Sequence, residues 1–319
     1  MTIRAWPPRR LALAGAAAAL ALFAAPAGAA EYPLHAGDSA VGEVQYILAE
    51  SGDNLADIAR QADIGYTEML AANRGVDPWS PALRTLAIPG FFILPDAPRE
   101  GIVINLAERR LYYFPRNGET VQTYPIGIGV IGRDTPLSVT RVVGKEEAPT
   151  WYPPPSIRAE RPELPPAVGP GPDNPLGDFA LRLGWPRYLI HGTNKPDGVG
   201  RNVSHGCLHL YPEDIASLLY EAVPIGTPVR AIEQPAAAAW VGTRLLLEVH
   251  PDKEQADQID MEQPMTPRLP AGLRELVADA AGEYADAIDW AAVERAGLQR
   301  SGLPVEIARR PLAELDAAR

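Results

Sequence analysis

The sequence predicts an α+β fold in which a mainly β domain lies between a small βααβ unit and a partly helical C-terminal region. Three observations along the chain predict it. Apolar residues recur at helical spacing between residues 45 and 95, alternate with a period of two from residue 101, and return to helical spacing after residue 270.

Residues 1–29 have the features of a signal peptide. Three arginines precede an apolar run at 11–25, and small residues around Ala27 and Ala29 fit a cleavage site. A membrane anchor is the alternative, but the apolar run is shorter than the roughly 20 residues that span a bilayer. We therefore expect export to the periplasm and removal of residues 1–29.

The bulk composition limits the classes of partner. The chain has 319 residues, which allows two or three domains, and its formal net charge is −11. Such an acidic chain is not expected to bind nucleic acid or anionic lipid as its main partner.

Residues 44–95 are predicted to form a small domain. Strands at 46–48 and 86–88 enclose two helices, of which the first follows a turn at 51–54 and the second covers 67–73. This order, with the strings GDNLADIA and LAANRGVDP, resembles a LysM domain. That family binds the N-acetylglucosamine backbone of peptidoglycan or chitin; the alternative is a small α/β packing unit that binds no glycan.

Residues 100–233 are predicted to form the mainly β domain. Its strands are expected at 102–106, 111–114, 121–128, 179–183, 188–190 and 227–232, and a helix at 212–220. The proline-rich segment 145–175 has no regular period, and long irregular segments inside a compact domain are usually functional.

The C-terminal region, 234–319, has a weaker pattern. A strand is expected at 245–249, and amphipathic helices are expected at 273–284 and 289–299. Nothing in these residues points to a particular chemistry.

The candidate chemistry centres on the string SHGCLH at 204–209, which holds the only cysteine of the chain and two of its five histidines. A lone cysteine in an exported chain is a buried thiol, an intermolecular link or a reactive thiol. A strand that ends at His191 and the loop 192–204 can bring an imidazole beside Cys207, where it would act as the base for the thiol. Gly206 would let its own amide and that of Cys207 approach a bound carbonyl as oxyanion donors.

The flanking residues make this pattern specific. The strings LIHGTNK at 189–195 and VSHGC at 203–207 resemble the signature of the L,D-transpeptidase (YkuD-like) catalytic domain. Four further strings agree with that family: TWYPP at 150–154, PDNPLG at 172–177, YPEDI at 211–215 and GTPV at 226–229. Together with the LysM-like unit, the chain is most similar to the ErfK/YbiS-like subgroup.

The resemblance implies a role for each residue of the motif. Cys207 would be the nucleophile, His191 the general base, and the carbonyl of Gly192 the group that orients the imidazole. Ser204 and His205 would support the loop by hydrogen bonding.

The resemblance also implies the substrates. The donor would be a tetrapeptide stem of peptidoglycan, attacked between its third residue, a diamino acid, and the terminal D-alanine. The resulting thioester would be resolved by an amine of another stem or by a lysine of an outer-membrane lipoprotein.

Four residues are candidates for substrate contact: Thr193, His209, Trp151 and Trp185. The two tryptophans fit a hydrophobic core equally well. His209 departs from the family, which commonly has arginine or asparagine there, and Ser138 stands where glycine is usual.

Three alternatives remain beside the transpeptidase. Histidines and a thiol are also zinc ligands, but Gly206 and the flanking strings favour acyl transfer, so we expect neither a metal nor a cofactor. The same residues would serve an L,D-carboxypeptidase or amidase if water resolved the thioester. A non-catalytic peptidoglycan-binding protein is the third alternative, which intact His191 and Cys207 disfavour.

Overall fold

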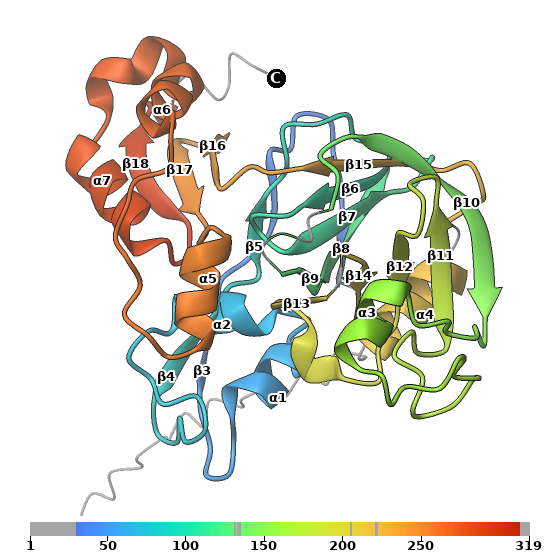
Figure 1. Cartoon of the computed structure of the whole chain (residues 1–319). Helices are drawn as coiled ribbons and strands as arrows, with labels where there is room; N and C mark the ends of the chain where they lie inside the picture. The colour runs from blue at the N-terminus through green and yellow to red at the C-terminus, as the bar shows by residue number, and fades with distance from the viewer. Residues whose placement is uncertain (1–29, 131, 133–134, 205, 221–222, 313–319) are drawn as a thin grey trace, which may run out of the picture.

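The computed structural model describes residues 30–130, 132, 135–204, 206–220 and 223–312 (Figure 1). The predicted signal peptide and His205 lie outside the described residues. Within the described part of the chain, no helix is both long and apolar enough to cross a bilayer.

A nine-stranded sheet forms the centre of the molecule. In spatial order its strands are β1 (Ala30–Pro33), β8 (Thr120–Pro125), β7 (Arg110–Phe114), β6 (Gly101–Asn105), β15 (Pro228–Ile232), β10 (Val139–Glu147), β11 (Phe179–Leu183), β12 (Leu189–His191) and β14 (Leu208–His209). The pairs β6–β15 and β12–β14 are parallel, and the other neighbours are antiparallel. The predicted α+β class with a mainly β centre is confirmed.

The sheet curves back on itself at the end that carries the cysteine motif. Its last strand, β14, is bridged through His209 to Gly127, and each residue donates its N–H to the other's carbonyl, at 2.8 and 3.1 Å. Gly127 lies between β8 and β9 (Ile128–Gly129), which pairs in parallel with β13 (Asn202–Ser204). The single strand expected at 121–128 is therefore two strands, because the chain breaks here to cross the end of β14.

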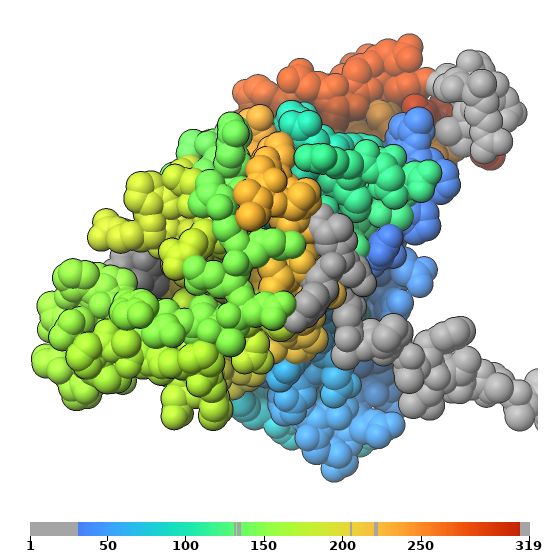
Figure 2. All heavy atoms as spheres, turned by 90° about the vertical axis from the view of Figure 1, so that its right-hand side faces the viewer, coloured from blue at the N-terminus to red at the C-terminus, as the bar shows by residue number. Residues whose placement is uncertain are grey.

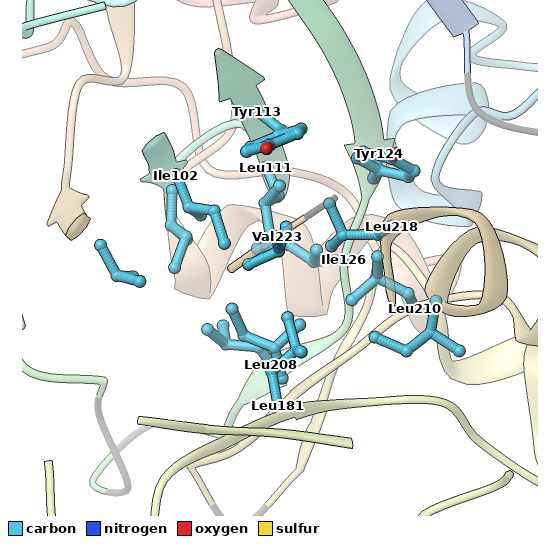
Figure 3. Packing of buried hydrophobic residues seen from close by; sticks show 14 of the residues in the cluster. Ile102, Leu111, Tyr113, Tyr124, Ile126, Leu181, Leu208, Leu210, Leu218 and Val223 are labelled. Atoms are coloured by element: carbon cyan, nitrogen blue, oxygen red, sulfur yellow. The ribbon is translucent and has the colours of Figure 1, made fainter. Parts of the chain in front are cut away.

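One face of the sheet packs on α4 (Pro212–Tyr220). Figure 3 shows Leu218 of this helix converging with side chains from the sheet, among them Leu111 of β7, Leu181 of β11 and Leu208 of β14. Because Leu208 follows Cys207 directly, this core fixes the position of the cysteine.

The other face of the sheet is covered by the N-terminal unit. That unit contains β2 (Ala40–Gly42), β3 (Gln45–Leu48), α1 (Leu55–Gln61), α2 (Tyr66–Ala72), β4 (Thr85–Ile88) and β5 (Phe91–Ile93). The predicted order strand–helix–helix–strand is present, with β3 and β4 antiparallel and the Asn54 side chain capping α1 at 2.9 Å from the Asp57 N–H. Its apolar side chains share one core with Val103 and Tyr112 of the central sheet.

The proline-rich segment projects as a lobe at the left of Figure 2, in green and yellow-green. It holds one short helix, α3 (Pro155–Glu160), which the sequence did not predict. Fully buried Asn174 ties the lobe together, because its side-chain amide donates to the Pro149 carbonyl at 2.6 Å and accepts from the Leu176 N–H at 2.9 Å.

The C-terminal region forms a small sheet covered by helices. Its elements are β16 (Ala236–Val241), β17 (Arg244–Val249), α5 (Lys253–Asp260), α6 (Leu273–Ala281), the 3-10 helix η2 (Gly282–Ala287), α7 (Trp290–Gln299) and β18 (Val305–Arg309). The helix expected at 273–284 ends at Ala281 because Gly282 has a φ of 57°. The Asp289 side chain caps α7 as expected.

Candidate active site

The parallel pairing of β12 and β14 brings the two halves of the cysteine motif together. In this register His191 pairs with His209 and Ile190 pairs with Leu208. Side chains of paired residues share a face and alternate along each strand. Extending the register by one residue pairs Cys207 with Leu189, so Cys207 and His191 belong to the same face.

The imidazole of His191 is buried, with 6% of the residue exposed, and is fixed by the next residue. Its Nδ1 lies 2.5 Å from the Gly192 carbonyl, which accepts a hydrogen bond only if Nδ1 carries the proton. Burial lowers the pKa of His191 to about 3, helped by His209 and opposed by the bond to Gly192. The neutral ring therefore has Nε2 free of a proton and able to accept one.

The thiol of Cys207 is partly exposed and lies against backbone atoms of Arg187 and Leu189. Its Sγ is 3.6 Å from the carbonyl of Arg187, in the turn between β11 and β12. Burial raises the pKa of Cys207, and a hydrogen bond from the backbone of Leu189 opposes that shift. Since the pKa of His191 is lowered at the same time, the resting site holds a neutral thiol and a neutral imidazole.

The turn before the cysteine is held by Ser204. Its hydroxyl donates to the Cys207 carbonyl at 2.6 Å and accepts from the Gly206 N–H at 3.1 Å. Gly206 has a φ of 109°, which favours glycine, and its carbonyl accepts from the Thr135 hydroxyl at 3.2 Å. The Gly206 amide expected as an oxyanion donor is thus already engaged with Ser204.

His209 is buried next to His191. Its imidazole occupies a space between Gly127 and Gly198, which we call the seat of His209. Its Nε2 is 3.1 Å from the Gly198 carbonyl, and its ring centre is 6.0 Å from that of His191. A Cβ on Gly127 would come within 1.7 Å of this Nε2. Only 9% of His209 is exposed, so its role as a substrate contact stays a prediction that its burial does not favour.

The other candidate substrate contacts have structural partners. Thr193 is buried, and its hydroxyl accepts from the Lys195 N–H at 2.9 Å. Trp151 is partly buried and exchanges backbone hydrogen bonds with Val168 in the lobe. Trp185 is partly buried, and its indole N–H donates to the Ser138 hydroxyl at 3.1 Å. Of these residues, Trp185 belongs to the same turn as Arg187.

Three residues near the motif were not singled out by the sequence. Arg187 contributes a carbonyl, which any residue type would supply, and has a φ of 71°. Gly127 and Gly198 surround His209 from other parts of the chain. The sequence gives no signal for Arg187 and Gly127, because their roles depend on backbone position and on a distant neighbour.

Comparisons with known proteins identify the class of protein. The family model described as the YkuD L,D-transpeptidase catalytic domain matches residues 99–230. The chain belongs to the L,D-transpeptidase family, as the motif predicted.

Relatives from Escherichia coli strain K12 are similar over most of this chain. It is 42% identical to the probable L,D-transpeptidase YcfS, covering 93% of this chain and 94% of that protein. It is 40% identical to the probable L,D-transpeptidase YbiS, covering 92% of this chain and 97% of that protein. The NMR structure of the catalytic domain of the E. faecium L,D-transpeptidase acylated by ertapenem gives a TM-score of 0.33 at 21% identity, covering 43% of this chain and all of that one.

Proposed function

We propose that this chain is a peptidoglycan L,D-transpeptidase in which Cys207 is the nucleophile and His191 the general base. The observation that carries the proposal is the parallel β12–β14 pair, with the His191 imidazole oriented by the Gly192 carbonyl. This orientation leaves Nε2 to receive the thiol proton.

The first half of the reaction forms a thioester. As Sγ of Cys207 attacks the carbonyl between the diamino acid and the terminal D-alanine, the thiol proton passes to Nε2 of His191. Because the resting thiol and imidazole are both neutral, proton transfer accompanies the attack. The backbone amide of Cys207 donates to the developing oxyanion. His191 then returns the proton to the leaving amine, and D-alanine departs.

The second half transfers the acyl group. An amine from another stem peptide attacks the thioester, gives up a proton to His191 and displaces the thiol. A lysine of an outer-membrane lipoprotein is the second acceptor we propose, and water would make the enzyme an L,D-carboxypeptidase or amidase. The catalytic residues are the same for all three acceptors.

The remaining assignments complete this proposal. A signal peptide at 1–29 directs the chain to the periplasm. The N-terminal unit, which we propose to be LysM-like, binds glycan strands; its β3–α1–α2–β4 order supports this. Binding of the Cys207→Ala chain to insoluble peptidoglycan, and its competition by N-acetylglucosamine oligosaccharides, would test the second assignment.

The decisive test is intact mass of the mature protein after incubation with a carbapenem. We expect one covalent adduct on the parent and none on Cys207→Ala. A His191→Gln variant keeps the thiol but should acylate at least 100-fold more slowly, because the base is lost. A parent with reduced thiol and no adduct would contradict the proposal and favour the binding-only alternative.

The acceptor is then read from the products. Incubation with purified tetrapeptide stems should release D-alanine and give a crosslinked dimer. Release of D-alanine with only tripeptide would instead identify a carboxypeptidase.

A further inference from the structure

Three buried side chains meet where the three parts of the molecule join. Glu108 lies in the turn between β6 and β7, Glu248 lies on β17, and His250 follows that strand. They are 6%, 1% and 5% exposed. One ligand atom from each lies within 4.8 Å of the other two, and no other such group of three is found among the described residues.

Each carboxylate of this cluster has one oxygen fixed by a hydrogen-bond donor, and Glu248 also has an unpartnered oxygen. The Tyr112 hydroxyl donates to Oε2 of Glu108 at 2.8 Å, and the Ile93 N–H donates to Oε2 of Glu248 at 2.9 Å. Oε1 of Glu248 and Nε2 of His250 are buried without a hydrogen-bond partner in the described structure. Oε1 of Glu108 is 3.8 Å from that Nε2. Buried polar atoms left in this way require a cation or a proton.

The neighbouring arginines do not fill the site. Arg110 forms an ion pair with Glu68 at 2.9 Å. Arg109 donates to a backbone carbonyl at 3.1 Å, and Arg300 donates to the His250 carbonyl at 3.1 Å. In the described structure these three arginines therefore pair with other groups and not with the carboxylates of Glu108 and Glu248.

We propose that Glu108, Glu248 and His250 form a binding site for a divalent transition-metal cation, with Zn²⁺ as the best match. Two carboxylate oxygens and one imidazole nitrogen are ligands that zinc accepts, with a water as the fourth. The hydrogen bonds from Tyr112 and Ile93 orient the carboxylates in the way that outer partners of metal ligands do.

The position of the site gives the cation a structural role. It would join the N-terminal unit through Ile93, the central sheet through Glu108 and the C-terminal region through Glu248. A cavity of about 10 Å³ lies beside the cluster and has room for about one water; Glu108, His250 and Arg109 are among its lining residues. This role is independent of the reaction at Cys207.

The experiment uses the mature Cys207→Ala protein, so that the active-site thiol cannot bind the metal. After removal of metal with EDTA and dialysis, ZnCl₂ is titrated at pH 7 and binding is followed by calorimetry. We expect one zinc per chain and a higher melting temperature. Anomalous scattering at the zinc edge should give a peak between the three side chains.

Matched variants locate the site. Glu248→Gln keeps the acceptor for the Ile93 N–H and should weaken zinc binding on the order of 100-fold, as should His250→Gln. Glu254→Gln, which changes an exposed side chain of α5, should leave zinc binding unchanged. Absence of zinc binding by folded Cys207→Ala, or binding that both cluster variants retain, would overturn the proposal; circular dichroism establishes folding.

Discussion

At the scale of single residues, the surroundings of His191 and Cys207 determine the protonation of both side chains. His191 is kept neutral by burial and by neighbouring His209, and its proton is held on Nδ1 by the Gly192 carbonyl. Burial keeps Cys207 protonated. A neutral thiol resists oxidation, since the thiolate is the reactive form.

The first prediction concerns the pH dependence of acylation. A histidine with an ordinary pKa near 6.5 would lose about 97% of its neutral form between pH 7.5 and 5, a roughly 30-fold loss of base. Because the pKa of His191 is lowered to about 3, its neutral form persists through this range. The second-order rate of carbapenem acylation, measured by stopped flow, should therefore stay level from pH 7.5 to 5. A fall in the acylation rate with a midpoint near pH 6.5, in protein that circular dichroism shows to be folded, would contradict the lowered pKa of His191.

The second prediction concerns the seat of His209. Gly127→Ala should displace the imidazole, since the new Cβ would lie 1.7 Å from its Nε2. We expect a loss of about 1–3 kcal/mol in unfolding free energy, typical of overpacking, and slower acylation.

Gly144→Ala in β10 is the matched control for this substitution. A Cβ there would meet nothing closer than 3.6 Å. Denaturant unfolding and adduct formation should leave Gly144→Ala close to the parent, and equal effects of the two variants would argue against the proposed seat.

At the scale of elements, α5 is the connection between the C-terminal region and the cysteine motif. It lies outside the matched residues 99–230. Its Asp260 accepts from Arg201 at 2.7 Å, and its Asp257 accepts from the Asn202 side chain at 2.7 Å. Since β13 begins at Asn202 and ends at Ser204, this helix anchors the strand that leads into the turn of Cys207. The C-terminal region thereby gains a role that its sequence did not suggest.

The third prediction tests that anchor. Asp260→Asn removes the charge that pairs with Arg201 and should slow carbapenem acylation several-fold, because a small displacement of the turn misplaces the thiol. The cost in stability should stay below about 1 kcal/mol, as for other partly exposed ion pairs.

Glu254→Gln, on the same helix, is the control for Asp260→Asn. Its partner is Arg268, at 2.8 Å, and the pair does not involve β13. Adduct formation over time should be unchanged in this variant. If both variants slow acylation alike, the effect belongs to the helix as a whole and not to its contact with Arg201.

At the scale of the whole molecule, the three parts share interfaces that a division by sequence does not show. The N-terminal unit and the central sheet have one continuous core, which includes Tyr112. The hydroxyl of Ser39 donates to the Trp240 carbonyl at 2.7 Å, joining the N-terminal unit to β16. The N-terminal unit is therefore joined to the central sheet by a shared core and to the C-terminal region by a hydrogen bond.

The fourth prediction follows from this shared core. Residues 99–230 expressed alone would expose Val103, Tyr112, Phe114 and Val121, which the N-terminal unit now covers. Burying a large apolar side chain stabilises by about 1.5–3 kcal/mol, so the excised domain should be far less stable than a chain that begins at residue 30. Thermal melting of the two proteins, followed by circular dichroism, makes the comparison. An excised domain that melts as high as the longer chain would show that the N-terminal unit is not needed for stability.

The sequence by itself determined the family and most regular elements, and it singled out the residues that we propose to react. Helices such as α1 and α4 were predictable because their caps and apolar spacing are local. The SHGC motif was readable because a lone thiol with a nearby imidazole is rare and chemically specific. Elements without local patterning were missed: β16 is a run of alanines, and α5 has few apolar residues and depends on a capping box between Asp252 and Gln255.

Only the tertiary structure decided how the site is arranged and protonated. The seat of His209 depends on Gly127, and the pairing of Arg201 with Asp260 joins residues 59 positions apart. The cluster of Glu108, Glu248 and His250 joins segments still more distant in sequence. Local sequence determines where helices and strands tend to form. Desolvation and the pairing of buried polar groups depend instead on which distant residues the fold brings together.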